Sequence, residues 1–330
     1  MEGQMSPTRF LEFFANSSCI LGEGAVIERL RRNTGLELDP HVVNSTFVYD
    51  GAKRAALETI CRQYLDIGYR YDLPLLLSTP TWRASRERIE AAGYAGKDLN
   101  GDNYRFLDEL RNRYGDYASK VVICGLLSCR GDAYNPAEAL STAEAREFHG
   151  WQATMLANAG VDFLLAATLP ALSEAAGLAL ALGATGKPYI VSFVVRSNGT
   201  LLDGTPLKDA IGAIDAAARP EPLAYLVNCT HASIFRNALL HPANSSPLVR
   251  ERVIGLLANT AALNPEELDN SAALVEEDPE TFGRSVAALH TELGMKILGG
   301  CCGTDDRHIL CLATQLQSAA TGESHNFQPA

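Results

Sequence analysis

Near its end the chain reads Leu298-Gly299-Gly300-Cys301-Cys302-Gly303-Thr304, with two adjacent cysteines between glycines. The apolar run 295–298 precedes this turn, and the helical pattern 305–317 follows it. A strand is therefore predicted to end at Gly299, which places the cysteines on the turn into the next helix. Because glycine tolerates positive φ and lets a ligand approach closely, both thiols can point into one pocket.

Short apolar runs alternate with longer helical patterns along the whole chain. Eight runs predict strands, at 19–21, 73–77, 121–127, 161–166, 189–195, 223–227, 253–258 and 296–299. The patterns between them predict helices at 53–68, 83–92, 103–114, 141–159, 172–182, 206–217, 232–239 and 278–293. One of these helices opens on the capping pattern Ser141-Thr142-Ala143-Glu144.

Eight strand-then-helix units without a change in composition predict one α/β domain, a single (β/α)8 TIM barrel over residues 1–330. An open doubly wound sheet is the competing architecture, and eight similar units disfavour it. The polar stretch 264–278 is predicted to be a loop, and residues 322–330 a loose tail.

Composition limits the class of protein. The 330 residues carry a formal net charge of -11 and no Lys/Arg cluster, which argues against binding to nucleic acid or an anionic membrane. No apolar run approaches the roughly 18 residues that cross a bilayer, and the charged segment 1–14 does not resemble a secretory signal. We therefore expect a cytoplasmic protein with small-molecule partners, and a homo-oligomer remains open.

A third cysteine ends another predicted strand. Cys229 follows the sixth predicted strand, whereas Cys301 and Cys302 follow the eighth. The reactive face of such a barrel lies at the C-terminal ends of its strands, and only one strand separates these two. We therefore predict that the three sulfurs meet and hold one Zn²⁺ ion, which accepts thiolates and prefers four ligands. The fourth position would be left for a substrate.

Other assignments compete with this metal site. His231 and His308 lie near the cysteines in the sequence and are alternative ligands, although a role as polar residues at helix starts is the simpler explanation for both. The turn 299–304 could cradle a phosphate at a helix N-terminus, which would leave the cysteines unexplained. Without a secretory signal we expect reduced cysteines, and five lie among apolar or helical residues as small buried side chains. These are Cys19, Cys61, Cys124, Cys129 and Cys311.

The charge of the ligand set indicates which reaction it suits. Zn²⁺ with three thiolates has a net charge of -1, so it activates water weakly. A thiol in the fourth position would lose its proton at neutral pH and stay nucleophilic enough to attack an activated alkyl group. The sequence therefore favours thiol alkylation over zinc hydrolysis.

The motif Gly299-Gly300-Cys301-Cys302-Gly303-Thr304, with Asn228-Cys229 upstream, resembles the homocysteine S-methyltransferase family. This family includes enzymes that use betaine or S-methylmethionine as methyl donor, and the homocysteine domain of cobalamin-dependent methionine synthase. Segments 149–170, 192–193 and 203–207 add weaker similarity. The resemblance implies a (β/α)8 barrel, zinc on the three cysteines, homocysteine as the thiol and methionine as the product.

Substrate-binding positions implied by the resemblance are Glu23, Gly24, Thr168 and Asn228, and the first three of them stand in altered motifs. The family usually has Asp-Gly where this chain has Glu23-Gly24, and Glu-Thr where it has Ala167-Thr168. That second glutamate would bind the amino-acid end of homocysteine, and losing a charged hydrogen bond costs roughly 1.5–3 kcal/mol. Two alternatives follow: the same zinc chemistry on another thiol or donor, or a non-catalytic zinc-binding homologue.

Methyl donors for this chemistry usually carry a cationic ammonium or sulfonium group, which favours aromatic surroundings. Candidates by composition alone, against the simpler explanation of core packing, are Phe47, Tyr49, Trp82, Tyr134 and Trp151.

Overall fold

The computed structural model describes residues 7–32, 35–263 and 277–321. Its eight strands pair in parallel, each with the next in sequence, and β8 closes on β1. The strands are β1 (Ile20–Gly22), β2 (Leu75–Ser78), β3 (Val121–Ser128), β4 (Phe163–Leu169), β5 (Tyr189–Phe193), β6 (Ala224–Thr230), β7 (Val253–Ala258) and β8 (Ile297–Gly300). This closed (β/α)8 barrel confirms the predicted fold class and excludes the open sheet.

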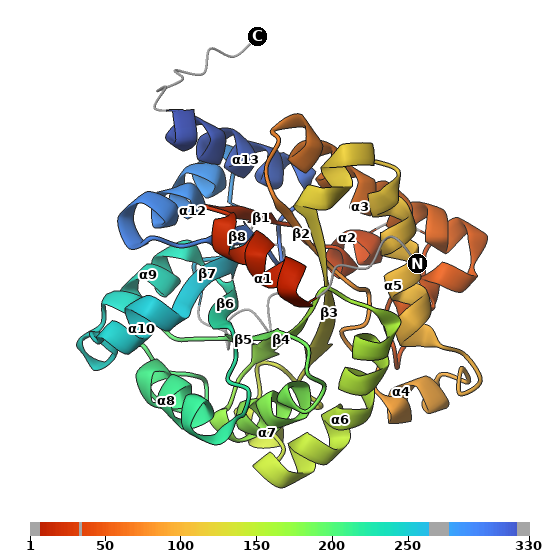
Figure 1. Cartoon of the computed structure of the whole chain (residues 1–330), viewed down its shortest axis with the longest axis horizontal. Helices are drawn as coiled ribbons and strands as arrows, with labels where there is room; N and C mark the ends of the chain where they lie inside the picture. Colours follow the sequence, from red (N-terminus) through yellow and green to blue (C-terminus); the bar gives the residue numbers. More distant parts are fainter. Residues whose placement is uncertain (1–6, 33–34, 264–276, 322–330) are drawn as a thin grey trace.

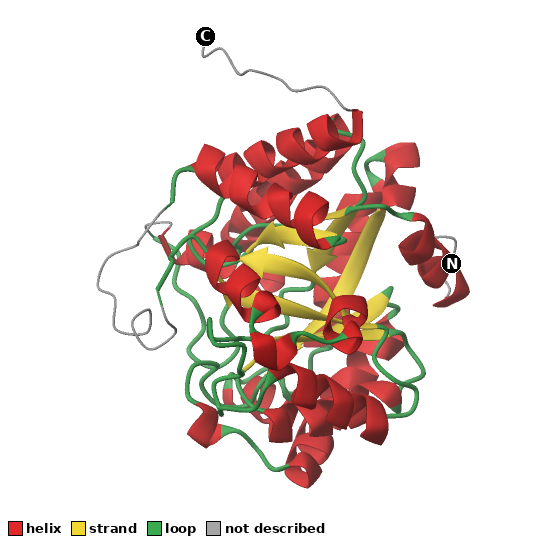
Figure 2. Cartoon of the chain, turned by 90° about the vertical axis from the view of Figure 1, so that its left-hand side faces the viewer, coloured by secondary structure: helices red, strands yellow, loops and turns green. Residues whose placement is uncertain are grey.

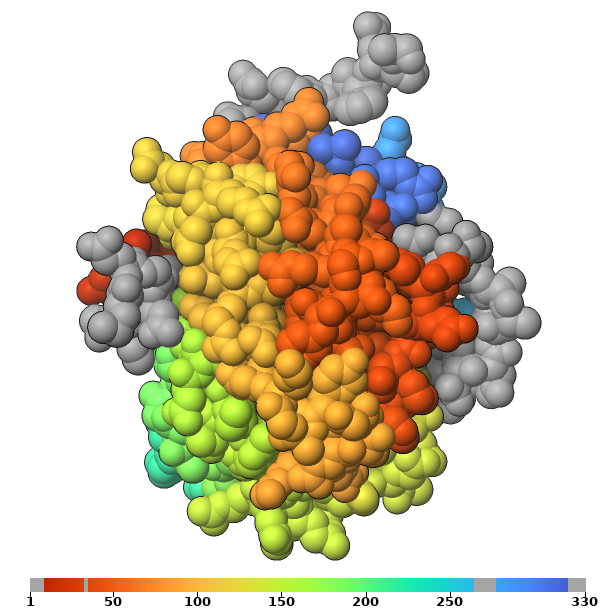
Figure 3. All heavy atoms as spheres, turned by 90° about the vertical axis from the view of Figure 1, so that its right-hand side faces the viewer, coloured from red at the N-terminus to blue at the C-terminus, as the bar shows by residue number. Residues whose placement is uncertain are grey.

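Helices surround the strands in an outer layer, apart from the first helix, which lies across one end of the barrel (Figures 1 and 2). They are α1 (Pro7–Asn16), α2 (Ile27–Arg32), α3 (Gly51–Arg70), α4 (Arg86–Ala91), α5 (Leu99–Asn112), α6 (Thr142–Ala159), α7 (Leu172–Gly183), α8 (Leu207–Ala217), α9 (Ala232–Leu240), α10 (Pro247–Arg252), α12 (Pro279–Leu293) and α13 (Asp306–Thr321). Figure 3 shows one side of this layer, where the segments that contain α3, α4 and α5 cover the barrel. Among the described residues no helix is both long and apolar enough to cross a membrane.

Apolar side chains fill both faces of the barrel wall. One cluster lies between strands and helices, and a second, which includes Ile20, Leu76, Val122 and Leu226, lies inside the barrel. Strands buried on both faces read as continuous apolar runs in the sequence, which is why all eight were predicted. Of the five cysteines expected in the core, four are buried and Cys311 is partly exposed.

Several helix boundaries differ from the prediction. The capping box of α6 is present as expected, with Ser141 and Glu144 bonded reciprocally. The helix predicted at 83–92 begins only at Arg86, after the N-cap Ser85. The helix predicted at 103–114 begins earlier, at Leu99, because the Asp98 side chain caps it. Helices α1, α2 and α10 were not predicted, and both the tail 322–330 and most of the loop 264–278 lie outside the described residues.

Helix α1 packs across the N-terminal end of the barrel (Figure 1). Phe10 is 1% exposed and belongs to the interior cluster, and its ring stacks on that of Phe163 with centroids 4.8 Å apart. This helix therefore closes the barrel at the end opposite the predicted site.

Removing the Phe10 ring should leave a cavity at this end. Phe10→Ala is expected to lower the free energy of unfolding by about 3–5 kcal/mol, measured by urea denaturation. The matched control is Leu11→Ala, because Leu11 is 42% exposed and should change stability by less than about 0.5 kcal/mol. Equal effects of the two variants would contradict this role of α1.

Candidate metal centre

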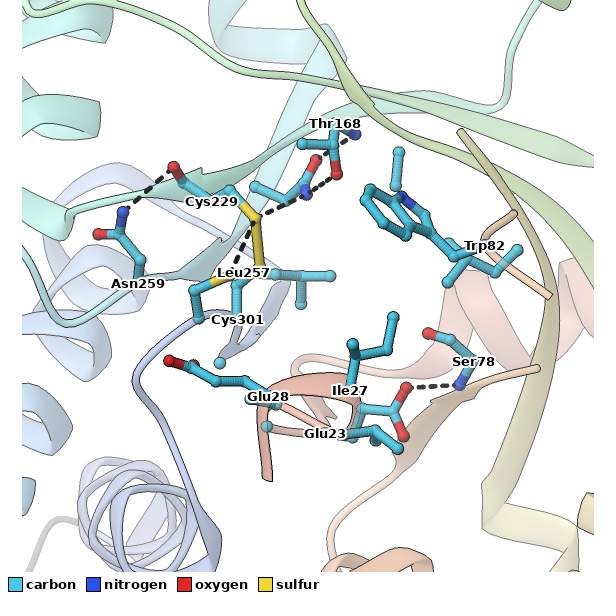
Figure 4. Close-up of a pocket in the computed structure, with 18 of the residues that line it drawn as sticks. Glu23, Ile27, Glu28, Ser78, Trp82, Thr168, Cys229, Leu257, Asn259 and Cys301 are labelled. Atoms are coloured by element: carbon cyan, nitrogen blue, oxygen red, sulfur yellow. Dashed lines mark hydrogen bonds between the residues drawn. A yellow bond between two sulfur atoms is a disulfide. The ribbon is translucent and has the colours of Figure 1, made fainter. Parts of the chain in front are cut away.

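The three predicted cysteines meet at the C-terminal mouth of the barrel, and Figure 4 shows two of them, Cys229 and Cys301. Their sulfurs lie within 4.8 Å of one another, and those of Cys229 and Cys302 are 4.0 Å apart. A Zn–S bond of about 2.3 Å puts two thiolates of a tetrahedral site roughly 3.8 Å apart, which is close to the separation of the Cys229 and Cys302 sulfurs. The three cysteines in their reduced form therefore suit one metal ion. Among the described residues no other three His, Cys, Asp or Glu side chains bring their ligand atoms this close together.

Cys229 and Cys301 are joined as a disulfide in this structure, which differs from the expectation of reduced cysteines. The ends of β6 and β8 bring the two residues close enough for either a disulfide or a shared metal ion. Only the reduced pair supplies thiolates, so metal binding and the disulfide exclude each other.

Hydrogen bonds between the strand ends fix the cysteines. The Cys301 amide donates to the Ala258 carbonyl at 2.7 Å, and the Thr260 amide donates to the Cys302 carbonyl at 3.2 Å. Cys229 has a φ of 50°, a left-handed conformation that a non-glycine residue rarely adopts. The backbone thus turns sharply at Cys229, where β6 ends.

Thr304 holds the turn that carries the adjacent cysteines. Its hydroxyl donates to the Cys301 carbonyl at 2.7 Å and accepts from the Ala25 amide at 3.0 Å. Gly303 has a φ of 85°, and its amide donates to the Glu28 carboxylate. Since a carboxylate already takes this amide, and α13 begins with Asp306, the phosphate-cradle alternative is disfavoured.

The two histidines considered as ligands are engaged elsewhere. His231 caps α9, where its Nδ1 accepts from the Ser233 amide at 3.2 Å. His308 is fully buried on α13, with Nδ1 2.8 Å from an Asp305 carboxylate oxygen and Nε2 3.0 Å from the Glu277 carbonyl oxygen. Neither belongs to the sulfur cluster.

A cavity of about 690 Å³ opens beside the sulfurs. All the residues predicted to bind metal or substrate line it, namely Glu23, Gly24, Thr168, Asn228, Cys229, Cys301 and Cys302, and so does Ala167. The carboxylate of Glu28, the side chain of Ile27 and the amide of Asn259 were missed (Figure 4). Ile27 and Glu28 begin the six-residue helix α2, and Asn259 directly follows β7. Such short segments are too brief for hydrophobic periodicity to give a signal.

The aromatic candidates divide into two groups. Trp82 and Tyr134 line the cavity. Phe47 is fully buried, Tyr49 stacks on Tyr94, and Trp151 packs against an apolar cluster away from the cavity. For these three the core-packing or surface explanation holds, and composition could not separate them from the first two.

Asn228 connects the ends of three strands. Its Oδ1 accepts from the Thr168 amide at 2.8 Å and from the Ser192 hydroxyl at 2.6 Å, and its Nδ2 donates to the Thr168 hydroxyl at 2.7 Å. Thr168 has a φ of 61°. The Asn228 amide therefore fixes this strained residue and the backbone next to Cys229.

Glu23 places a carboxylate on the cavity wall. Its Oε1 accepts from the Ser78 amide at 2.8 Å, and its Oε2 has no hydrogen-bond partner among the described residues. Burial raises the pKa of this carboxyl to about 8, although the hydrogen bonds to Ser78 oppose the shift. Glu23 is therefore mostly protonated at neutral pH, and a neighbouring cation would favour its ionised form.

The fold and the site together define a class of protein. It is a (β/α)8 barrel enzyme whose three cysteines meet at one cavity at the C-terminal mouth and, when reduced, are suited to holding a metal ion. The sequence profile of the homocysteine S-methyltransferase family matches residues 20–316. The chain belongs to this family of methyltransferases.

Individual relatives agree with this assignment. Homocysteine S-methyltransferase YbgG of Bacillus subtilis is 29% identical over 209 residues, a match that spans 62% of each chain. Homocysteine S-methyltransferase of Escherichia coli is 30% identical over 251 residues, 71% of this chain and 76% of that one. Betaine–homocysteine S-methyltransferase 1 of Bos taurus is 22% identical over 93% of this chain and 74% of its own.

A solved structure shares the fold. The metallated form of the homocysteine methyltransferase MmuM from Escherichia coli has a TM-score of 0.72 and 21% identity, and the match covers 94% of this chain and 100% of that one. An oxidized form of the same protein matches with a TM-score of 0.72 and 22% identity.

Metal binding should depend on the redox state of the cysteines. The reduced protein is expected to bind one Zn²⁺ per chain, and the disulfide form to bind at least about 100-fold more weakly, because it has lost two of its three thiolates. Elemental analysis and competition with a chromophoric chelator would measure this. Cys311→Ser is the matched control, since Cys311 lies outside the cluster, and equal zinc affinity in both redox states would contradict the ligand set.

The raised pKa of Glu23 should appear in the pH dependence of stability. An unfolded glutamate releases its proton near pH 4.3, whereas folded Glu23 keeps it up to about pH 8. Between these values the folded state binds more protons, so this carboxyl lowers the free energy of unfolding as pH rises. Glu23→Gln should remove this slope and be more stable than wild type at pH 8 by at least about 1 kcal/mol.

Urea denaturation from pH 4.5 to 8, with reduced and metal-free protein throughout, would measure this effect. Glu147→Gln, at an exposed position on α6, should keep the wild-type slope. Parallel curves for wild type and Glu23→Gln would show that Glu23 is not buried as described.

Proposed function

We propose that this chain transfers a methyl group from a small cationic donor to a thiol, with homocysteine as the thiol and methionine as the product. The observation that carries the proposal is the meeting of Cys229, Cys301 and Cys302 at one cavity in a barrel of this family. Zinc bound to these thiolates would lower the pKa of a thiol in its fourth position.

The other residues of the cavity suit an amino-acid thiol. The free Oε2 of Glu23 is available to accept from the substrate ammonium, which would draw the carboxyl into its ionised form. Gly24 lies next to it on the cavity wall and packs closely against the helices behind, because a Cβ there would lie 2.8 Å from the Tyr64 hydroxyl. Asn228 and Thr168 hold the cavity wall next to Cys229.

The donor side of the cavity carries the rings of Trp82 and Tyr134, which attract an ammonium or sulfonium cation. In the transfer, the substrate sulfur forms a bond to the methyl carbon while the bond from that carbon to the donor heteroatom breaks. The electron pair stays on the donor, which leaves as a neutral amine or thioether. Aligning the two reactants within one cavity would supply much of the rate. We place this zinc-dependent step in cytoplasmic methionine biosynthesis.

Ala167 favours a second candidate. It lies at the cavity end of β4 and offers no charge to a substrate. The same chemistry on a different thiol or donor, or zinc binding without catalysis, would fit a cavity in which position 167 supplies no carboxylate and Glu23 supplies a buried one.

A panel assay tests the proposed function. Reduced, zinc-loaded protein is assayed with homocysteine and other thiols against betaine, S-methylmethionine and a methylated corrinoid. Cys302→Ala should lower kcat/KM by at least about 100-fold, whereas Cys311→Ala should not change it. Methyl transfer that survives Cys302→Ala overturns the zinc mechanism. Normal zinc content with no transfer and no calorimetric thiol binding would favour the non-catalytic candidate.

Restoring a glutamate at position 167 separates homocysteine from other thiols. If homocysteine is the substrate, Ala167→Glu should lower its KM by about 10-fold, since a charged hydrogen bond to the ammonium contributes roughly 1.5–3 kcal/mol. Ala167→Gln controls for side-chain size without the charge. A KM for homocysteine that rises equally in both variants, with another thiol preferred by wild type, would favour the second candidate.

A further inference from the structure

A buried hydrogen-bonded pair of side chains lies behind the cavity wall, outside the site described above. Glu174, in the first turn of α7, and His149, on α6, have side chains that are 0% and 1% exposed. The His149 Nε2 lies 2.9 Å from the Glu174 Oε1. Burial alone would raise the pKa of Glu174, but hydrogen bonds from His149 and the Arg130 amide outweigh it and lower that pKa. The carboxylate is therefore ionised and accepts hydrogen bonds only.

The same carboxylate bonds to both ends of the β3–α6 loop, which we define as residues 129–140. Oε1 accepts from the Arg130 amide at 2.7 Å, and Oε2 accepts from the Leu140 amide at 3.3 Å. One buried side chain thus closes a loop of a dozen residues at its two ends. Without it these two amides would lose their acceptor.

This loop forms part of the cavity. Its residues Asp132, Ala133 and Tyr134 line the cavity. Inside the loop, Glu138 accepts from the Asp132 amide at 2.9 Å and from the Asn135 side chain at 3.0 Å. The loop is therefore internally braced, and its placement over the barrel depends on how its ends are held.

The loop is also tied to the neighbouring aromatic wall. The Arg83 Nη1 donates to the carbonyls of Cys129, Arg130 and Gly131 at 3.2, 2.9 and 2.7 Å. The same guanidinium lies 4.3 Å above the ring centre of Trp82. Figure 4 shows Trp82 across the cavity from Cys229 and Cys301. A change in loop position would therefore reach the donor side before it reaches the sulfurs.

We propose that Glu174 and His149 are positioning residues: together they hold the β3–α6 loop so that Asp132, Tyr134 and Trp82 form the wall facing the methyl donor. The proposal rests on the proposed function only in taking this wall as the donor side. Holding this loop in place is a different role from that of a buried charged group that only stabilises the barrel.

The chain offers a matched control for that distinction. Asp162 is also fully buried, and its Oδ2 accepts from the Ile123 amide at 2.7 Å and from the Arg111 Nη1 at 2.7 Å. It precedes β4 and so lies at the opposite end of the barrel from the cavity. Asp162→Asn should lower stability without affecting the loop.

The direct test needs no substrate. In Glu174→Gln the amide group cannot accept from both loop ends, so amide hydrogen exchange over residues 130–140 should become at least tenfold faster. The chain has two tryptophans, so Trp151→Phe leaves Trp82 as the sole tryptophan, whose fluorescence is excited selectively at wavelengths that tyrosine does not absorb. In that background Glu174→Gln should at least double the acrylamide quenching of Trp82. Asp162→Asn should change neither readout.

Kinetics supply the second readout. With S-methylmethionine or betaine as the probe, Glu174→Gln should raise the donor KM at least fivefold while the thiol KM and zinc content stay unchanged. His149→Leu should act in the same direction, and His149→Gln, whose amide can still donate to Glu174, should restore wild-type behaviour. If Glu174→Gln does not fold, His149→Leu decides the outcome.

Exchange and quenching that match wild type, or that change equally in Asp162→Asn, would overturn the proposal. A wild-type enzyme without methyl transfer from any donor refutes the proposed function instead. The two failures are distinguishable because the exchange and quenching measurements require no reaction.

Discussion

The position of the three sulfurs depends on the parallel register of β6, β7 and β8. Asn228 pairs with Leu257, which pairs in turn with Gly299, so the strand ends that carry the cysteines stand at the same height. A slip of one residue would turn Cys229 toward the opposite face of the wall. Barrel closure thereby brings together residues 72 positions apart in the chain, and the hydrogen bonds of Cys301 and Thr260 extend the register past the last strand pairs.

The strands were predictable because their environment is uniform. Each is buried on both faces, so an apolar run bounded by turns was a sufficient signal. Helix boundaries were harder to predict where the residues at a helix start are also typical of turns. The Asn100-Gly101 pair is typical of a turn, yet Asp98 caps a helix through the Gly101 amide, and so α5 begins before the predicted start. Helices α2 and α10 have six residues each, too few to establish a period of 3.6.

Residues of the site were predictable where the residue type alone indicates a role. They were not predictable where the role depends on the direction in which the side chain points. Adjacent cysteines in a glycine turn have few other uses, so their convergence with Cys229 followed from strand order. Trp82 and Trp151 have the same chemistry, and only the fold turns one toward the cavity and the other into packing. The capacity of Cys229 and Cys301 to pair as a disulfide likewise follows from three-dimensional proximity that spacing in the sequence does not reveal.

The negative charge of the three cysteine thiolates bears on the two positions where the chain departs from the family pattern, Glu23 and Ala167. Three thiolates give even a zinc-bound centre a net negative charge, and each ionised carboxylate nearby would add to it. Glu28 is neutralised by Arg32 and by the Gly303 amide, whereas Glu23 keeps its proton because burial raises its pKa to about 8. Alanine at position 167 removes a further negative charge. Without a bound cation the Glu23 carboxyl is therefore uncharged. A cationic substrate would displace its proton and would then be bound by the resulting carboxylate. Binding of such a substrate should be coupled to proton release from this one side chain.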